Sequence, residues 1–121
     1  CIPLIVFSDP QVVVVGMTEA DASSAGIAAT SSGFPLAASG RARTLGAGDG
    51  FVTVVADGDG TVIGVQAVGA HVAELAGEAA LAVETAATVE DMAGTIHAHP
   101  TLGEALVEVA MGLAGRPLHA G

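Results

Sequence analysis

The sequence predicts a single domain of the α+β class, with an antiparallel sheet in its first half and helices in its second. Two sequence patterns, one on each side of Gly69, lead to this prediction. Up to Gly69, β-branched runs alternate with short turns, and beyond Gly69 the apolar residues recur at the 3.6-residue spacing of a helix. The length of 121 residues allows one domain with its own core. It is too short for a dinucleotide-binding domain together with a substrate domain.

The chain opens with two short apolar runs, residues 4–7 and 12–15, which predict strands. Between them stands the sequence Ser-Asp-Pro-Gln, and an Asp-Pro pair is typical of a turn. A short helix is expected next, because Thr18 and Asp21 have the spacing of a helix cap and Gly26 provides a stop.

Three further strands complete the first half. Residues 27–35 predict a strand, which a connection through residues 39–41 joins to the middle of the chain. There, the β-branched runs 51–56 and 61–68 flank the sequence Asp-Gly-Asp-Gly. Such a pattern is typical of a hairpin, because glycine accepts the positive φ of the turn. The sheet is therefore expected to be antiparallel.

The second half predicts three helices. Apolar residues recur at helical spacing over residues 72–83 and again over residues 102–113. A shorter helix is expected over residues 88–92, where Thr88 and Asp91 repeat the capping pattern seen at Thr18. Because the strands come first and the helices second, alternating βαβ units are excluded.

The charge balance excludes several partners. The chain has 3 basic and 13 acidic side chains, no lysine, and a net charge of −10. Three arginines are too few to form a basic surface that binds a phosphate backbone, so nucleic acid and anionic membranes are not expected partners. No apolar run approaches the roughly 18 residues of a membrane-spanning helix. A single cysteine, Cys1, forms no internal disulfide, and we expect a cytoplasmic protein.

The acidic surface also predicts salt adaptation. Glu74 and Glu78 stand four apart in an expected helix without a nearby lysine, and like charges at this spacing repel. Summed over a net charge of −10, such repulsion weakens a fold at low ionic strength. A halophilic source is therefore expected.

The one dense cluster of reactive side chains lies at residues 97–104, with the sequence His-Ala-His-Pro-Thr-Leu-Gly-Glu. Histidine transfers protons readily near neutral pH. A histidine directly before a helix and a glutamate in its first turn can meet, and a carboxylate on one ring nitrogen leaves the other free for acid/base work. His99 and Glu104 are therefore candidate catalytic residues.

Two other interpretations of the cluster stay open on the residues alone. Thr101 and Glu104 have the spacing of a capping box, which explains Glu104 without catalysis. Alternatively, His97, His99 and Glu104 could ligate a metal ion, although so few ligands without a cysteine are a weak signal.

At this cluster the sequence resembles the C-terminal interface domain of the dihydrolipoamide dehydrogenases, within the FAD-dependent pyridine nucleotide–disulfide oxidoreductases. The resemblance covers almost the whole chain, and the segment from His97 to Glu104 is its most specific motif. Related mercuric reductases lack the His-Pro-Thr element, whereas glutathione reductases share the histidine and the glutamate. The other motifs are Ile2-Pro3, Phe7-Ser8-Asp9-Pro10, Val15-Gly16-Met17-Thr18-Glu19, Ser39-Gly40-Arg41-Ala42, Gly50-Phe51-Val52, Ile63-Gly64, Val68-Gly69 and Ala73-Glu74-Leu75.

The resemblance implies an architecture and a role for the site. The expected fold is an antiparallel sheet of about five strands flanked by helices, which dimerises through one face. His99 matches the family's acid/base for the dithiol substrate, and Glu104 matches its orienting partner. The backbone of His99 and Pro100, joined by a cis bond, is expected near the flavin of the other subunit.

The resemblance also implies what the rest of the enzyme supplies. Residues 1–121 match the C-terminal dimerisation domain, and the FAD domain, the NAD domain and the redox-active cysteine pair are absent from this chain. The full enzyme oxidises dihydrolipoamide to lipoamide with FAD and NAD⁺, as a homodimer that serves a lipoyl-bearing protein of a 2-oxoacid dehydrogenase complex. The fragment alone is expected to bind neither cofactor and to be inactive. The alternative is a free-standing acidic dimerisation or binding module without catalysis.

Overall fold

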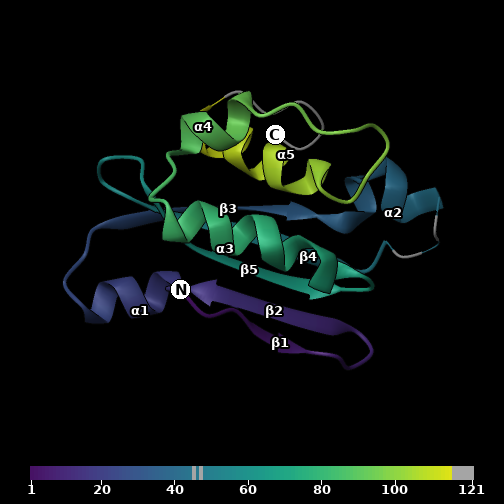
Figure 1. Cartoon of the computed structure of the whole chain (residues 1–121), viewed down its shortest axis with the longest axis horizontal. Coiled ribbons are helices and arrows are strands. Elements are labelled where there is room, and N and C mark those ends of the chain that lie inside the picture. Colours follow the sequence, from purple (N-terminus) through teal and green to yellow (C-terminus); the bar gives the residue numbers. More distant parts are fainter. Residues whose placement is uncertain (45, 47, 116–121) are drawn as a thin grey trace.

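The computed structural model describes residues 1–44, 46 and 48–115 and places a helical layer on one face of a sheet (Figure 1). The sheet has five antiparallel strands in the order β1-β2-β5-β4-β3. The strands are β1 (Leu4–Val6), β2 (Gln11–Gly16), β3 (Ala29–Pro35), β4 (Gly50–Asp57) and β5 (Val62–Gly69). The predicted α+β class and the antiparallel sheet are thus confirmed.

Five α-helices and two short 3₁₀ turns lie in the described part of the chain. The α-helices are α1 (Glu19–Ser24), α2 (Gly40–Thr44), α3 (Ala76–Glu84), α4 (Val89–Gly94) and α5 (Glu104–Leu113), and the 3₁₀ turns are η1 (Leu36–Ala38) and η2 (Val72–Leu75). None of the helices in the described part of the chain is long and apolar enough to cross a membrane.

Burial alternates along β2 and over the first half of β4, as expected where one face of a strand packs against helices. In β2, Val13 and Val15 are buried, and in β4 the same is true of Val52 and Val54. These side chains pack under α3, which contacts β2 and β5, and under α5, which contacts β3 and β4. Helix α4 packs against α5 (Figure 1). The core of the domain therefore lies between the sheet and α3 and α5.

Both predicted capping boxes are present. The Thr18 hydroxyl accepts a hydrogen bond from the backbone N–H of Asp21, whose carboxylate accepts one from the N–H of Thr18. Thr88 and Asp91 form the same pair at the start of α4. The backbone amides and hydroxyls of the two threonines hold the pKa of Asp21 and Asp91 below the ordinary aspartate value.

One predicted connection and two predicted helices differ from the structure. The connection at residues 39–41 runs into helix α2, which the buried Ser39 side chain caps by accepting from the N–H of Ala42. The helix expected over residues 72–83 begins as the 3₁₀ turn η2. The helix expected from Leu102 has a first turn with bonds three residues apart, such as Ala105 N to Leu102 O, so α5 itself begins at Glu104. Apolar spacing alone does not separate the two helix types.

The acidic surface is arranged differently from the expectation in one respect. Glu74 belongs to η2 and Glu78 to α3, and Glu78 Oε1 lies 2.6 Å from Nε2 of His97. Arg41 and Arg43 both lie on α2, while Arg116 falls outside the described residues. Glu78 therefore has a histidine as its partner, while Asp21, Asp57 and Asp91 accept hydrogen bonds from backbone N–H groups.

We expect the thermal unfolding midpoint of the chain to rise between dilute buffer and molar potassium chloride. The reason is that repulsion among surface carboxylates is screened over about 10 Å at 0.1 M salt and about 3 Å at 1 M. Circular dichroism melts across the salt series measure the midpoint, and a neutral osmolyte of equal osmolality is the control. A midpoint that stays level or falls contradicts the prediction.

Candidate active site on the segment before helix α5

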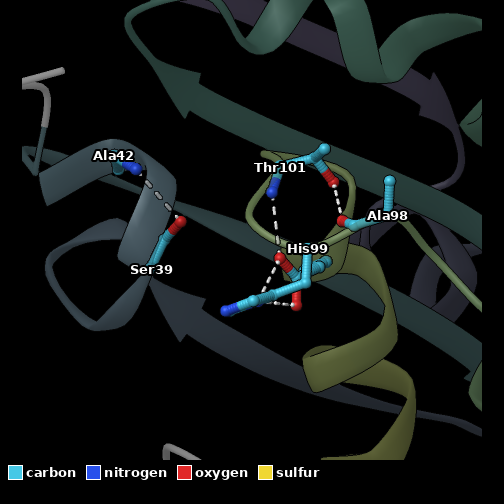
Figure 2. Close-up of polar contacts among 6 residues, drawn as sticks. Ser39, Ala42, Ala98, His99 and Thr101 are labelled. Carbon is cyan, nitrogen blue, oxygen red and sulfur yellow. Dashed lines mark hydrogen bonds and ion pairs between the residues drawn. The ribbon is translucent and has the colours of Figure 1, made fainter. Parts of the chain in front are cut away.

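The segment 95–103 joins α4 to α5 and folds back on itself through local hydrogen bonds (Figure 2). The Thr95 hydroxyl donates to the carbonyl of Asp91, which ties the start of the segment to α4. The Thr101 hydroxyl donates to the carbonyl of Ala98 at 2.6 Å, and the His99–Pro100 peptide bond is cis, as the resemblance implies. The segment thus presents His99 in a compact turn rather than in a loose loop.

His99 and Glu104 meet, as their spacing predicts. His99 Nδ1 lies 3.0 Å from Oε1 and 2.9 Å from Oε2 of Glu104. An ionised carboxylate can only accept, so Nδ1 carries a proton and donates it to Glu104. In the neutral ring this leaves Nε2 as the nitrogen that can accept a proton from another molecule.

The capping interpretation is half realised. The backbone N–H of Thr101 donates to Glu104 Oε1 at 2.9 Å, which is one of the two bonds of a capping box. The Thr101 hydroxyl is instead directed to Ala98. The Glu104 carboxylate therefore accepts from the backbone and from His99 at once, and the backbone bond fixes the carboxylate that orients the imidazole.

The pair is accessible to solvent, mainly through the histidine. The side chain of His99 is 76% exposed and that of Glu104 is 31% exposed. They line a hollow of about 190 Å³ together with Phe34, Ser39 and Arg43. Ser39 lies at the start of α2, beside the turn that holds His99 (Figure 2). A hollow of this size does not enclose a substrate of cofactor size, for which pockets of about 300–1,000 Å³ are usual.

The structure separates the two histidines of the predicted cluster. His97 Nε2 lies 2.6 Å from Glu78 Oε1 on α3, and its Nδ1 lies 3.0 Å from the carbonyl oxygen of Thr95. Within residues 1–44, 46 and 48–115, no three His, Cys, Asp or Glu side chains are grouped so as to hold a metal ion. The alternative of a metal site from His97, His99 and Glu104 therefore has no geometric support.

Sequence reasoning missed the pairing of His97 with Glu78. The two residues are 19 positions apart and lie on different elements, so no local spacing connects them. A weak signal exists in hindsight, because Glu78 is an acidic residue without a lysine or arginine near it in sequence.

Comparison with known proteins decides the family. Residues 2–110 match the family described as the pyridine nucleotide-disulphide oxidoreductase dimerisation domain. The chain belongs to this family. The resemblance drawn from the sequence is thereby confirmed, together with the fold of a five-stranded sheet and helices that such domains share.

Relatives of this dimerisation domain are dihydrolipoyl dehydrogenases. The enzyme of Haloferax volcanii is 50% identical over 119 residues, which are 98% of this chain and 25% of the relative. The enzyme of Pseudomonas aeruginosa is 51% identical over the same share of this chain and 26% of its own length. The dimerisation domain thus spans about a quarter of the length of these relatives.

Relatives from halophilic archaea support the predicted salt adaptation. Besides Haloferax volcanii, they include Halobacterium salinarum, whose dihydrolipoyl dehydrogenase is 49% identical over 98% of this chain and 25% of its own length. This dimerisation domain thus has relatives in halophilic archaea as well as in Pseudomonas aeruginosa.

Solved structures agree on the fold. The LpdA protein of Mycobacterium tuberculosis is similar with a TM-score of 0.86 at 29% identity, over 93% of this chain and 25% of that one. The flavoprotein disulfide reductase RclA of Escherichia coli has the same fold, with a TM-score of 0.85 at 24% identity, over 90% of this chain and 25% of that one.

Proposed function

We propose that residues 1–121 form the C-terminal interface domain of a dihydrolipoyl dehydrogenase, in which His99 is the acid/base and Glu104 its orienting partner. The observation that carries the proposal is the bond from His99 Nδ1 to both carboxylate oxygens of Glu104 on an open surface. Relatives about 50% identical to the chain bear the name of this enzyme. The proposed homodimer brings the site of one subunit to the flavin of the other.

The solvent exposure of the His99 side chain is consistent with a site that a second subunit completes. Its side chain is 76% exposed and has no enclosing pocket of its own. An imidazole in this position can reach a dithiol and a flavin held elsewhere. In this proposal FAD, NAD and the redox-active cysteine pair belong to the rest of the parent chain, and the backbone of His99 and Pro100 lies beside the partner's flavin.

The chemistry of this domain is proton transfer. Oxidation of dihydrolipoamide to lipoamide removes two protons and two electrons, and NAD⁺ takes up both electrons and one proton. Nε2 of His99 takes the proton from a substrate thiol, because the thiolate is the nucleophilic form. Glu104 stabilises the resulting imidazolium through Nδ1–H, and the N–H of Thr101 holds the carboxylate in place. FAD, when bound in the parent enzyme, carries the electrons from the thiols toward NAD⁺.

Exposed apolar surface supports contacts with other domains. Leu4, Val6 and Phe51 are exposed on the face of the sheet that α3 and α5 leave open. On the helical side, Leu81 of α3 and Ile96 are exposed. Two separate apolar surfaces suit a domain that contacts both its parent chain and a second subunit, with a lipoyl-bearing protein as the external partner.

A substrate comparison on the full-length protein tests the proposal. With NAD⁺ we expect oxidation of dihydrolipoamide, and with NADPH we expect no reduction of glutathione disulfide, although glutathione reductases share the His-Glu pair. Light scattering of the same sample is expected to give a dimer. A dimer without dihydrolipoamide activity identifies a binding module instead, and preference for glutathione disulfide overturns the substrate assignment.

A further inference from the structure

The first histidine of the His-Ala-His segment lies in an environment opposite to that of the second. The side chain of His97 is 12% exposed, compared with 76% for His99. Its two ring nitrogens contact Glu78 Oε1 at 2.6 Å and the Thr95 carbonyl at 3.0 Å. His97 therefore faces inward, toward α3, while His99 faces solvent two residues later.

Both ring nitrogens of His97 have an oxygen partner. One is the backbone carbonyl of Thr95, and the other is the carboxylate of Glu78, whose 2.6 Å contact with Nε2 is short for a hydrogen bond to nitrogen. The other titratable side chains that share hollows with His97 are the carboxylates of Asp91, Glu104 and Glu108.

The pair connects α3 to the segment that carries His99. The hydrogen bonds of Thr95 and Thr101 join residues at most four apart, whereas the His97–Glu78 contact joins residues 19 apart. The His97 ring also packs against the residue before Glu104, because a Cβ on Gly103 would lie 3.1 Å from His97 Cδ2. A displaced His97 would thus shift both members of the His99–Glu104 pair.

We propose that Glu78 and His97 are positioning residues, which hold the His99 turn against α3 so that Nε2 of His99 is presented to the substrate. The inference rests on the proposed function. Neither residue needs to touch the substrate, since each acts through the position of His99 and Glu104. A small misplacement of a catalytic group is costly, and 1 Å can lower a rate about a hundredfold.

The test uses Glu78→Gln and His97→Gln in the full-length enzyme, alone and combined with His99→Gln. Glutamine keeps the shape of Glu78 but removes the negative charge of its side chain. We expect each single change to lower kcat for dihydrolipoamide about tenfold, with the KM for NAD⁺ unchanged. In the His99→Gln background the same changes are expected to have no further effect, because the group that they position is already gone.

The matched control is Glu84→Gln, which removes the same charge from the last residue of the same helix, outside the two hollows that His97 lines. It is expected to keep the wild-type kcat. FAD content and the thermal midpoint are measured for every variant, so that a loss of folded enzyme is separated from a loss of rate.

Three outcomes overturn the inference. They are a wild-type kcat in Glu78→Gln and His97→Gln, an equal loss of rate with and without His99, and an equal loss in Glu84→Gln. Each of these leaves the proposed function standing, provided that His99→Gln alone lowers the rate. Near-normal turnover of His99→Gln overturns the proposed function itself.

Discussion

Replacement of His99 by glutamine in the full-length enzyme is expected to lower the rate of dihydrolipoamide oxidation by about a hundredfold to ten-thousandfold. Glutamine has no group that takes a proton near neutral pH, so the substrate dithiol must lose its proton to water. The expected loss is in kcat rather than in FAD content, because the site is an exposed side chain that contributes little to the core. Steady-state kinetics with dihydrolipoamide and NAD⁺ measure it.

Two controls separate proton transfer from general damage. Oxidation of NADH by an artificial quinone acceptor needs no proton from a dithiol, and His99→Gln is expected to leave its rate unchanged. Glu104→Gln keeps an acceptor for Nδ1 but removes the negative charge that stabilises the imidazolium, so its loss is expected to be smaller. Near-normal dihydrolipoamide turnover in His99→Gln contradicts the assignment of His99 as the acid/base.

The largest expected effect on stability comes from Gly64→Ala in β5. A Cβ at this position would lie 1.7 Å from the carbonyl oxygen of Met17 and 2.7 Å from its carbonyl carbon. These are backbone atoms, held by the bonds from Met17 N to Ile63 O and from Gln66 Nε2 to Met17 O. The chain must move at the end of β2, where Gly16 pairs with Gly64, and we expect a loss of about 3 kcal/mol or more.

Gly77→Ala is the matched control for this substitution. Gly77 lies in α3, and beyond its chain neighbours and the nearby backbone of its own helix no atom comes within 4 Å of the place that an alanine methyl would take. Alanine is therefore expected to stabilise the domain by up to about 1 kcal/mol through its higher helix propensity. Denaturant unfolding of the two variants measures the difference. A Gly64→Ala variant as stable as the wild type contradicts the close approach of β5 to Met17.

The sequence predicts those structural elements that depend only on residues close together in the chain. The capping boxes of Thr18 and Thr88 and the hairpin at residues 57–60 each need only residues a few positions apart. The same holds for His99 and Glu104, because five residues and the first turn of a helix fix their separation. Local geometry therefore yields the candidate catalytic pair before any fold is known.

Features that depend on distant parts of the chain are not predictable in this way. Helix α2 follows a capping serine that spacing alone does not distinguish from a loop residue. The His97–Glu78 contact depends on how α3 packs beside the segment before α5, and the sequence pattern instead invites a metal site from His97 and His99. The family is recognised from motifs spread along the chain rather than from any one local spacing, since its model matches residues 2–110.

Mixed dimers of the full-length enzyme test the central claim most directly. One subunit carries His99→Gln, and the other keeps His99 but lacks the redox-active cysteines of its own chain. If His99 serves the flavin of the opposite subunit, the mixed dimer has one complete site and about half the activity of the wild-type dimer, although each parent dimer is inactive. A mixed dimer as inactive as its parents contradicts the claim, because it means that His99 acts within its own subunit or not at all.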